Sequence, residues 1–387
     1  MLVNPQTFAQ TIKAALAAVR PLGEQFPQYL GKGHFRTGGK RSCALAAVDG
    51  ELRVLAEGED RLAWGVVPLE GEPPIGNATL RIDLPLLRSA LESLSYEPQV
   101  DVALADGRLH IAAPTANLVL PAPEIDAPNL PTLAAAQALP DGALRAAHVL
   151  LPYLSRDDTR AVLMHVQFAH SAGQWSVAAT DTHRLGVVRL DGPGEAPEAF
   201  REVLIPLDVL KSAPTFLGEG AQMYTTSDPA WVALASPRAT VLWRKHVGAF
   251  PDWQKVLDYE KSPVGHAELP IAATLRALKT ADVVGRDDAD RVRILDAGDR
   301  TTIVAEYRDE QARAEAAVEG ATWVGTQREV NLNGAYLAQI LRAHRGLGAK
   351  TARITLHGAL NQVQIEGVEP PAASALSFKS VVMPMQK

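Results

Sequence analysis

The stretch ATDTHRL, at residues 179–185, places a carboxylate and an imidazole at close spacing. On a strand, Asp181 and His183 would share one face, where they could serve as the acid and base of a hydrolase or nuclease. The sequence supplies neither a G-x-S-x-G elbow nor an H-E-x-x-H helix to complete such a site. We therefore expect no catalytic residues, and keep a hydrolase or nuclease that uses this pair as the alternative.

Three further features could suggest a ligand or metal site, but each lacks a required residue or spacing. GKGHFRTGGKRS (31–42) has His34 where a Walker A phosphate loop needs Gly, and Arg41 where it needs Ser or Thr. The run RDDADR (286–291) lacks the spacing of a calcium loop. The single cysteine, Cys43, can form neither an internal disulfide nor a cysteine zinc site. We expect no cofactor and no metal.

The composition is that of a folded chain with sizeable cores. Of 387 residues, 47% are hydrophobic and 21% are charged, with a net charge of −6. The first residues lack a basic segment followed by an apolar one, and no apolar run is long enough to span a bilayer. The sequence therefore predicts a cytoplasmic protein of two to four domains with no membrane partner.

Six segments have the apolar periodicity of amphipathic helices. In the first, Phe8 and Ile12 fall on one face, and Asp83 and Asn333 are expected N-caps of later helices. The intervening segments alternate like strands, and VDVALADGRLHIAA (100–113) has the Asp-Gly turn of a hairpin. The helices are predicted at 5–20, 83–94, 142–156, 206–218, 269–281 and 333–348.

These elements recur with a period of about 125 residues, which is the length of a whole domain rather than of a solenoid repeat. The sequence predicts an α+β fold of three repeated domains at 1–130, 131–260 and 261–387, each with two helices and antiparallel sheets. Three unrelated α+β domains of similar length remain the alternative.

Positive charge is concentrated in the predicted helices. The six windows carry +7 and the rest of the chain carries −13, which suits helices that face a polyanion. Solvated helix faces that favour Lys and Arg would give the same count. Aromatic residues make up only 5%, so duplex binding without sequence preference is expected over single-strand binding. The expected DNA-facing residues are Lys13, Arg20, Arg145, Arg156, Arg276, Lys279, Arg342 and Arg345.

Four stretches stand in an order typical of one family: RDDTRAVLMHVQF (156–168), VAATDTHRLGVV (177–188), FPDWQKVL (250–257) and VVMPM (381–385). The chain thereby resembles the bacterial sliding clamp, the beta subunit of DNA polymerase III. Outside these stretches the resemblance rests on domain length and helix placement. It implies three clamp domains with two helices inside and sheets outside, and a head-to-tail homodimeric ring around double-stranded DNA.

The resemblance also implies a groove between the second and third domains that receives short apolar peptides from the replicative DNA polymerase and the clamp loader. Apolar burial would supply most of the affinity, and methionines would adapt to different partners. His183 and Arg184 would orient the peptide. Carried over position by position, the groove comprises Leu163, Thr180, Thr182, His183, Arg184, Leu185, Pro251, Lys255, Val256, Val381, Val382, Met383, Pro384 and Met385.

Four positions depart from the family pattern. Thr182 stands where the groove motif usually has glycine, and Lys255 stands where arginine is usual and cannot form its planar fork. Gln25, which the resemblance also implies to face DNA, corresponds to a basic residue that touches DNA, and Asp157 corresponds to a glutamine. We expect these changes to alter peptide preference and the path of the DNA.

The resemblance also suggests the residues of a dimer interface. Val283 and Val284 of the third domain would meet Leu118 and Leu120 of the first domain of a second copy.

Overall fold

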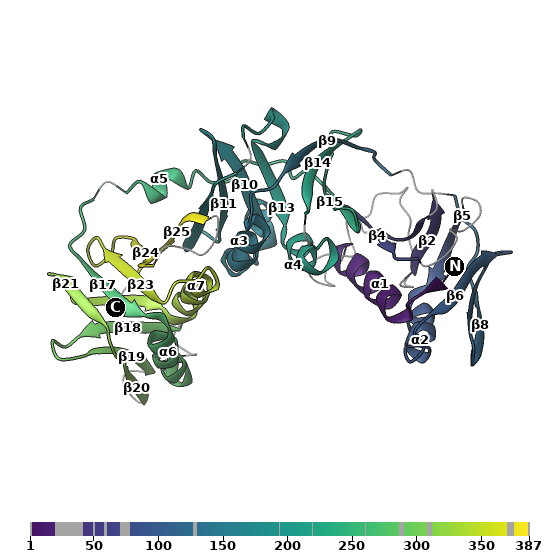
Figure 1. The fold of residues 1–387 in the computed structure, drawn as a ribbon. Coiled ribbons are helices and arrows are strands. Elements are labelled where there is room, and N and C mark those ends of the chain that lie inside the picture. Colours follow the sequence, from purple (N-terminus) through teal and green to yellow (C-terminus); the bar gives the residue numbers. More distant parts are fainter. Residues whose placement is uncertain are drawn as a thin grey trace. The chain divides into compact units, whose positions relative to one another are not determined.

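The structure is a computed structural model that divides into two compact units, one of Met1–Leu139 with Asp208–Lys245 and the other of Pro140–Leu207 with His246–Lys387 (Figure 1). Arg20, Gln25 and residues 31–41 lie outside the described part of the chain, as do residues 286–289. The structure describes residues 2–19, 42–48, 51–57, 60–69, 78–126, 130–192, 194–218, 220–259, 261–285, 290–307, 312–369 and 375–385.

One order of elements occurs three times along the chain: strand, helix, three strands, strand, helix, three strands. The first run is β1 (Leu2–Val3), α1 (Pro5–Val19), β2 (Ser42–Val48), β3 (Glu51–Glu57), β4 (Arg61–Val67), β5 (Ala78–Asp83), α2 (Leu84–Ser93), β6 (Val100–Ala105), β7 (Arg108–Ala113) and β8 (Ala116–Pro121).

The second run adds short helical turns at Leu151–Tyr153, Asp158–Met164 and Glu198–Phe200, and ends with the short helix α5 (Gln254–Leu257). Its main elements are β9 (Leu133–Ala138), α3 (Ala143–Leu150), β10 (His165–Ser171), β11 (Gln174–Thr180), β12 (Arg184–Leu190), β13 (Glu202–Pro206), α4 (Leu207–Phe216), β14 (Gln222–Thr226), β15 (Trp231–Ser236) and β16 (Ala239–Arg244).

The third run inserts one extra strand, β21 (Thr322–Gly325). Its other elements are β17 (Gly265–Pro270), α6 (Ile271–Gly285), β18 (Arg291–Asp296), β19 (Thr301–Tyr307), β20 (Ala312–Ala317), β22 (Glu329–Asn333), α7 (Gly334–Gly346), β23 (Thr351–Leu356), β24 (Val363–Gly367) and β25 (Ala375–Val382).

The first unit contains an eight-stranded sheet in the order β5-β2-β3-β4-β16-β15-β14-β9 and a four-stranded sheet in the order β1-β6-β7-β8. All pairings in these sheets are antiparallel. Helix α1 packs on β3, β4 and α2, and buries Phe8 and Ile12 as its periodicity predicts. The long sheet joins strands of the first and second runs where β4 pairs with β16.

The second unit repeats this plan. Its nine-stranded sheet has the order β13-β10-β11-β12-β25-β24-β23-β17-β21, and its four-stranded sheet has the order β20-β19-β18-β22. Here β12 of the second run pairs with β25 of the third run. Each long sheet therefore belongs to two successive runs, while the domain boundaries near residues 130 and 260 stay predictions.

Local signals explain where the elements begin and end. Asp83 and Asn333 cap α2 and α7 as expected, each side chain accepting a backbone N–H at the third residue after it. Asp106 and Gly107 both take positive φ, so the predicted Asp-Gly hairpin is present. Helix α3 ends at Leu150, well before residue 156, and a short 3-10 turn follows at Leu151–Tyr153; Pro152 has no N–H with which to continue the α-helical hydrogen bonds.

Two sequence expectations concern sites. Cys43 is buried, and burial raises the pKa of its thiol to about 12, which keeps it protonated and inert. Within the described ranges, no group of three His, Cys, Asp or Glu side chains could hold a metal ion. Among the described residues, no helix combines the length and apolar character needed to cross a bilayer.

Candidate functional site

The apolar C-terminal stretch completes the nine-stranded sheet of the second unit. Strand β25 lies between β12 and β24, and Val381 and Val382 are buried. Beyond the strand, the Met383 N–H donates to the His183 carbonyl at 3.0 Å, and the Met385 N–H donates to the Asn331 carbonyl at 2.9 Å. These two hydrogen bonds attach the tail to the turn directly before β12 and to strand β22.

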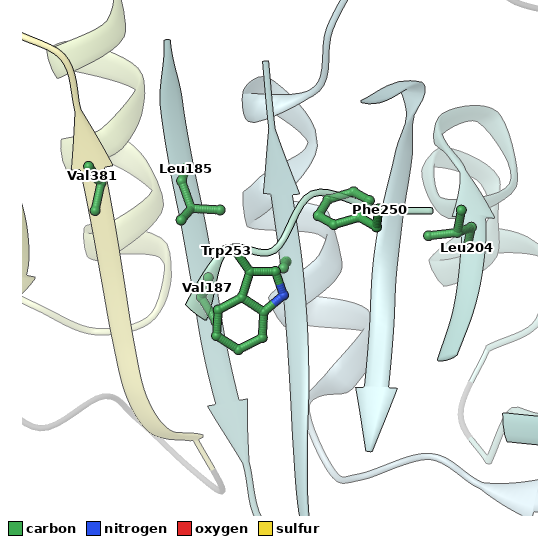
Figure 2. Close-up of a cluster of buried hydrophobic side chains, with 7 residues drawn as sticks. Leu185, Val187, Leu204, Phe250, Trp253 and Val381 are labelled. Carbon is green, nitrogen blue, oxygen red and sulfur yellow. The ribbon is translucent and has the colours of Figure 1, made fainter. Parts of the chain in front are cut away.

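A cluster of buried apolar side chains covers one face of this sheet (Figure 2). It comprises Ala178, Leu185, Val187, Leu204, Phe250, Trp253 and Val381. Trp253 is oriented by its indole N–H, which donates to Gln167 Oε1 at 2.7 Å. The structure thereby brings together two predicted groove residues, Leu185 and Val381. Sequence reasoning left out Phe250 and Trp253, although both aromatic rings lie in the FPDWQKVL motif that pointed to this region.

Other predicted groove residues lie at the surface beside this cluster. Met383 is 47% exposed and Val256 is 37% exposed, so both present apolar surface to solvent. Pro251 and Lys255 are also exposed, and Lys255 pairs with Asp252 at 2.9 Å. Pro384 and Met385 are half-buried, whereas Leu163 and Thr180 are buried.

The end of the tail borders a hollow of about 510 Å³ in the second unit. Leu360, which is 64% exposed, and Met385 supply apolar surface to it. The hollow is lined by Gln327, Arg328, Glu329, Val330, Asn331, Ala359, Leu360 and Met385. Most of these residues come from segments that the sequence analysis did not single out.

Arg184 is held inside the protein by several partners. Its Nε donates to Asp181 Oδ2 at 3.0 Å, and its terminal nitrogens donate to the Gln339 side chain and the Pro152 carbonyl. The Tyr336 ring centroid lies 4.1 Å from the guanidinium carbon. Arg184 therefore joins β12 to α7 and positions the wall of the predicted groove, while its contact with a peptide stays a prediction.

The Asp181 carboxylate is committed to the turn before β12. Its Oδ1 accepts the backbone N–H groups of His183 and Arg184, each at 3.0 Å, and its Oδ2 accepts from the Arg184 guanidinium. The His183 ring instead stacks on Tyr336, with centroids 6.3 Å apart. These contacts give the pair a structural role, and nothing in them supports the hydrolase alternative.

Thr182 occupies the left-handed region, with φ of +76°. A β-branched residue there stores strain of about 1–3 kcal/mol, and persists when the surroundings fix the backbone. The Thr182 N–H donates to Thr180 Oγ1 at 3.1 Å, and that hydroxyl donates to the Arg184 carbonyl at 2.7 Å. The turn is thus fixed by hydrogen bonds at the position where the sequence departs from glycine.

A network of buried polar side chains contacts β25 at Ser380. Ser380 Oγ lies 2.8 Å from the Tyr153 hydroxyl and 3.1 Å from His344 Nε2, and the His344 ring stacks on Phe378 at 4.0 Å. Burial lowers the pKa of His344 to about 3, so the imidazole is neutral, and burial raises the pKa of Tyr153. Because these side chains have almost no solvent access, the Ser–His pair is structural.

Helices α3, α6 and α7 of the second unit carry most of the predicted DNA-facing cations. Helix α7 packs against both α3 and α6, and Asp282 is the one acidic residue on the three helices. Arg145 also donates to the Gly346 carbonyl at 2.6 Å, at the end of α7. The exposed cations are Arg145, Arg276, Lys279, Arg342 and Arg345, and Arg156 is exposed beyond the end of α3.

The helices of the first unit carry less positive charge. Lys13 is exposed on α1, and Arg88 on α2 pairs with Glu92 at 2.6 Å. On α4, Lys211 is exposed, whereas Asp208 is buried and pairs with Arg61 of β4. The described helix surface that suits a polyanion therefore lies mainly in the second unit.

Two strands at the edges of the four-stranded sheets occupy the same places in their runs as strands that pair within the long sheets. In the first two runs, the third strand of the opening sheet, β4 or β12, pairs with the last strand of the following run, β16 or β25. In the third run the equivalent strand, β20, ends its sheet, and β8 of the first run ends another. Leu118 and Leu120 lie on β8, and Val283, which is 80% exposed, lies with Val284 near the end of α6.

No protein-family model and no curated protein matches the chain. Solved structures do match over essentially the full length of both chains, covering 100% of this chain and 99% of each match. The DNA polymerase III subunit beta from Pseudomonas aeruginosa has 16% identity and a TM-score of 0.79. The beta subunit from Thermotoga maritima has 14% identity and a TM-score of 0.78.

A further match is the sliding clamp from Pseudomonas aeruginosa bound to griselimycin, with 16% identity and a TM-score of 0.82. At these identities the likeness concerns the fold. The chain therefore has the α+β fold of the DNA polymerase III beta subunit, with helices and antiparallel sheets in the same repeated plan.

Proposed function

We propose that this protein is a DNA sliding clamp, which encircles duplex DNA and holds a replicative DNA polymerase on it. The observation that carries this proposal is the match of fold over the full length of both chains, at TM-scores of 0.78–0.82. In this role the protein is a cytoplasmic accessory subunit without catalytic activity. Its partners are double-stranded DNA, the polymerase, the clamp loader and a second copy of itself.

The edge strands support a head-to-tail dimer. Because β20 and β8 are the counterparts of strands that pair elsewhere in the chain, each can pair with the other edge in a second copy. Val283 and Val284 would then pack near Leu118 and Leu120, so that two copies of three domains close a ring.

The cationic helix layer of α3, α6 and α7 supports DNA binding through phosphates. Arg276 and Arg342 lie on adjacent packed helices and are exposed, which is what sequence-independent contact with a polyanion requires. Lys13 would add a weaker contact from the first unit. Such contacts let a ring slide because they do not read bases.

The surface beside the buried cluster supports peptide binding. Met383 and Val256 are exposed and lie within three residues of the cluster members Val381 and Trp253 in the sequence, so they would offer apolar surface to a short segment of a polymerase or clamp loader. Apolar burial at about 25 cal/mol per Å² would supply most of the affinity. The C-terminal tail thus serves both as a strand and as a docking wall.

Oligomeric state and DNA topology test the proposal. Sedimentation at micromolar concentration should show a dimer, and particle images should show a closed ring that remains on circular DNA but slides off linear DNA. Val283→Asp should shift the protein toward monomer, whereas Val324→Asp, at another exposed valine of the same unit, should not. A strict monomer in the unmodified protein, or equal loss from circular and linear DNA, would overturn the ring.

A further inference from the structure

The pairing of β4 with β16 in the first unit repeats the pairing of β12 with β25 in the second. Leu62 of β4 lies opposite Leu242 of β16. In the same way, Leu185 of β12 lies opposite Val381 of β25. Both leucines are the second residue of their strand, so the two pairs occupy equivalent places, and each pair contributes to an apolar cluster.

The hydrogen bonds beyond these pairs are also equivalent. The Arg244 N–H donates to the Asp60 carbonyl at 3.0 Å. The Met383 N–H donates to the His183 carbonyl, also at 3.0 Å. Asp60 and His183 each stand directly before the strand that carries the leucine. Arg244 therefore occupies in the first unit the place that Met383 occupies in the second.

The cluster of the first unit takes its aromatic side chains from the sheet itself. In the second unit, Phe250 and Trp253 come from the segment that follows β16. In the first unit, the aromatic rings stand on β4, β14 and β15, and those on β4 and β14 are half-buried. The first-unit cluster comprises Leu62, Trp64, Leu133, Tyr224, Trp231, Ala233 and Leu242.

This cluster lies on the face of the sheet that points away from the helices. A side chain at Gly65 would meet Thr11 of α1 and Phe216 of α4. Because side chains alternate between the two faces of a strand, Trp64 points away from both helices. The accessible parts of Trp64 and Tyr224 therefore offer apolar surface on that face.

Cationic side chains border the cluster. Arg244 is exposed, and its guanidinium carbon lies 4.9 Å from the centroid of the Trp231 ring. Lys245, the next residue along the chain, is exposed as well. A ligand that packs an apolar side chain on the first-unit cluster would thus meet positive charge beside it.

The carboxylates closest to these cations in the fold make other contacts. Asp60 Oδ2 lies 3.7 Å from a terminal nitrogen of Arg61. Asp228, whose carbonyl accepts the N–H of Trp231, uses its Oδ1 to accept the N–H of Ala230 at 2.9 Å. These contacts offset only part of the positive charge beside the cluster.

We propose that the first-unit cluster is a second docking site, which binds a short acidic peptide with apolar anchors from a partner protein. Charge complementarity favours this occupant, because the anchors would pack on Trp64 and Tyr224 while an Asp or Glu beside them pairs with Arg244. The groove proposed in the second unit has the neutral Met383 at that place. The inference goes beyond the proposed function and shares with it only the likeness of the two strand pairings.

Photo-crosslinking with paired peptides tests this site. The probe is a ten-residue peptide with leucine and tryptophan anchors and one benzophenone, flanked by either two Asp or two Lys residues. Mass spectrometry identifies the labelled residues of the full chain. The Asp peptide should label residues 60–64, 224–231 or 242–245 about fivefold more than the Lys peptide, and the excess should shrink as salt is raised. Labelling at 250–257 or 381–385 reports the groove of the second unit.

Variants at the equivalent place assign the preference to Arg244. Arg244→Met gives the first unit the residue that the second unit has there, so the preference for Asp should disappear while labelling of the first unit persists. Arg244→Glu should make the Lys peptide the better probe. Arg238→Met is the matched control and should keep the preference for Asp, since Arg238 is an exposed arginine at the opposite end of β16.

The outcomes separate this inference from the proposed function. Labelling confined to 250–257 and 381–385 would overturn the second site and leave the proposed function standing. Equal labelling of the first unit by both peptides, or a preference for Asp that survives in Arg244→Met, would overturn the acidic occupant. Labelling of the first unit alone would support the inference and contradict the groove of the second unit.

Discussion

Two seams hold the long sheets together: β4 against β16 in the first unit, and β12 against β25 in the second. In each seam, one of the two paired strands begins with a buried arginine. This residue is Arg61 in β4 and Arg184 in β12. Arg61 pairs with Asp208, whose Oδ1 is buried without a hydrogen bond among the described residues. Arg184 has a partner for each guanidinium nitrogen.

The two seams differ in how completely their buried polar groups are paired. At the first seam, burial raises the pKa of Asp208 to about 6 despite the nearby Arg61, so the ion pair is only partly compensated. At the second seam, Arg184 and Ser380 tie β12, β25 and α7 into one satisfied network. In the proposed peptide groove, such a rigid wall would lower the entropy lost when a peptide binds.

Removing each arginine gives the largest expected difference between the seams. Arg184→Met should cost about 3–5 kcal/mol of unfolding free energy, because Asp181 Oδ2 loses its ion-pair partner in a nearly buried site. Arg61→Met should cost less, about 2 kcal/mol, because Asp208 can take up a proton. Urea unfolding, read by brief hydrogen exchange in peptides from β4 and β12, gives each unit its own midpoint.

The double variant Arg184→Met with Asp181→Asn provides the control for this prediction. It should recover part of the loss, since it removes the uncompensated carboxylate. Equal losses for Arg184→Met and Arg61→Met would contradict the proposed difference between the seams.

Acidification should change the stability of the two units in opposite directions. The folded pKa of His344 is about 3 against 6.5 for the free side chain, so the unfolded chain binds more protons and stability is lost as pH falls below 6.5. Asp208 has the reverse sign, because its folded pKa of about 6 exceeds its usual 3.8. Between pH 7 and 5 the second unit should lose about 2 kcal/mol and the first should gain about 1 kcal/mol.

Unit-resolved urea midpoints at the two pH values check the signs. His344→Gln should flatten the pH response of the second unit, and Asp208→Asn should flatten that of the first unit. A common shift of both midpoints in the same direction would show that these two groups do not control the response.

The sequence predicted local features better than the seams. Asp83 and Asn333 were identifiable as caps because capping depends on neighbours three residues away. The pairing of β12 with β25 and the contact of Arg184 with Gln339 join residues more than 150 positions apart, and no local pattern encodes such contacts.

The groove was therefore reached through resemblance rather than periodicity. Two of the predicted groove residues, Leu185 and Val381, lie in one buried cluster, whereas its aromatic members Phe250 and Trp253 were not among the predicted residues, and the groove itself stays a prediction. Their burial follows from the return of the chain across β10 and β11 after β16, which is a tertiary feature. The strain at Thr182 was foreshadowed by the missing glycine, but its contact with Arg160 was not.

Two truncations distinguish the role of strand β25 from the role of the tail that follows it. Ending the chain after Val382 should weaken binding of an apolar probe peptide about tenfold, or ~1.4 kcal/mol, because Met383 offers exposed apolar surface. The urea midpoint of the second unit should hardly change. Ending the chain after Ser380 should in addition cost about 2–5 kcal/mol of stability, since Val381 and Val382 are buried.

Anisotropy with the labelled peptide and urea unfolding measure both effects. The first-unit midpoint is the internal control and should be the same in both truncations. Unchanged peptide affinity after removal of residues 383–387 would refute the assignment of the tail to the groove.

The smallest expected effect concerns the turn that precedes the second seam. Thr182→Gly should raise the unfolding free energy of the second unit by about 1 kcal/mol, because glycine adopts φ of +76° without the strain of a β-branched residue. Thr182→Ala loses the same hydroxyl but keeps part of the strain, so it should be less stable than Thr182→Gly. If glycine proved destabilising, the Thr182 hydroxyl would contribute more through Arg160 than the backbone loses, and the turn would be a stabilising part of the seam rather than a strained one.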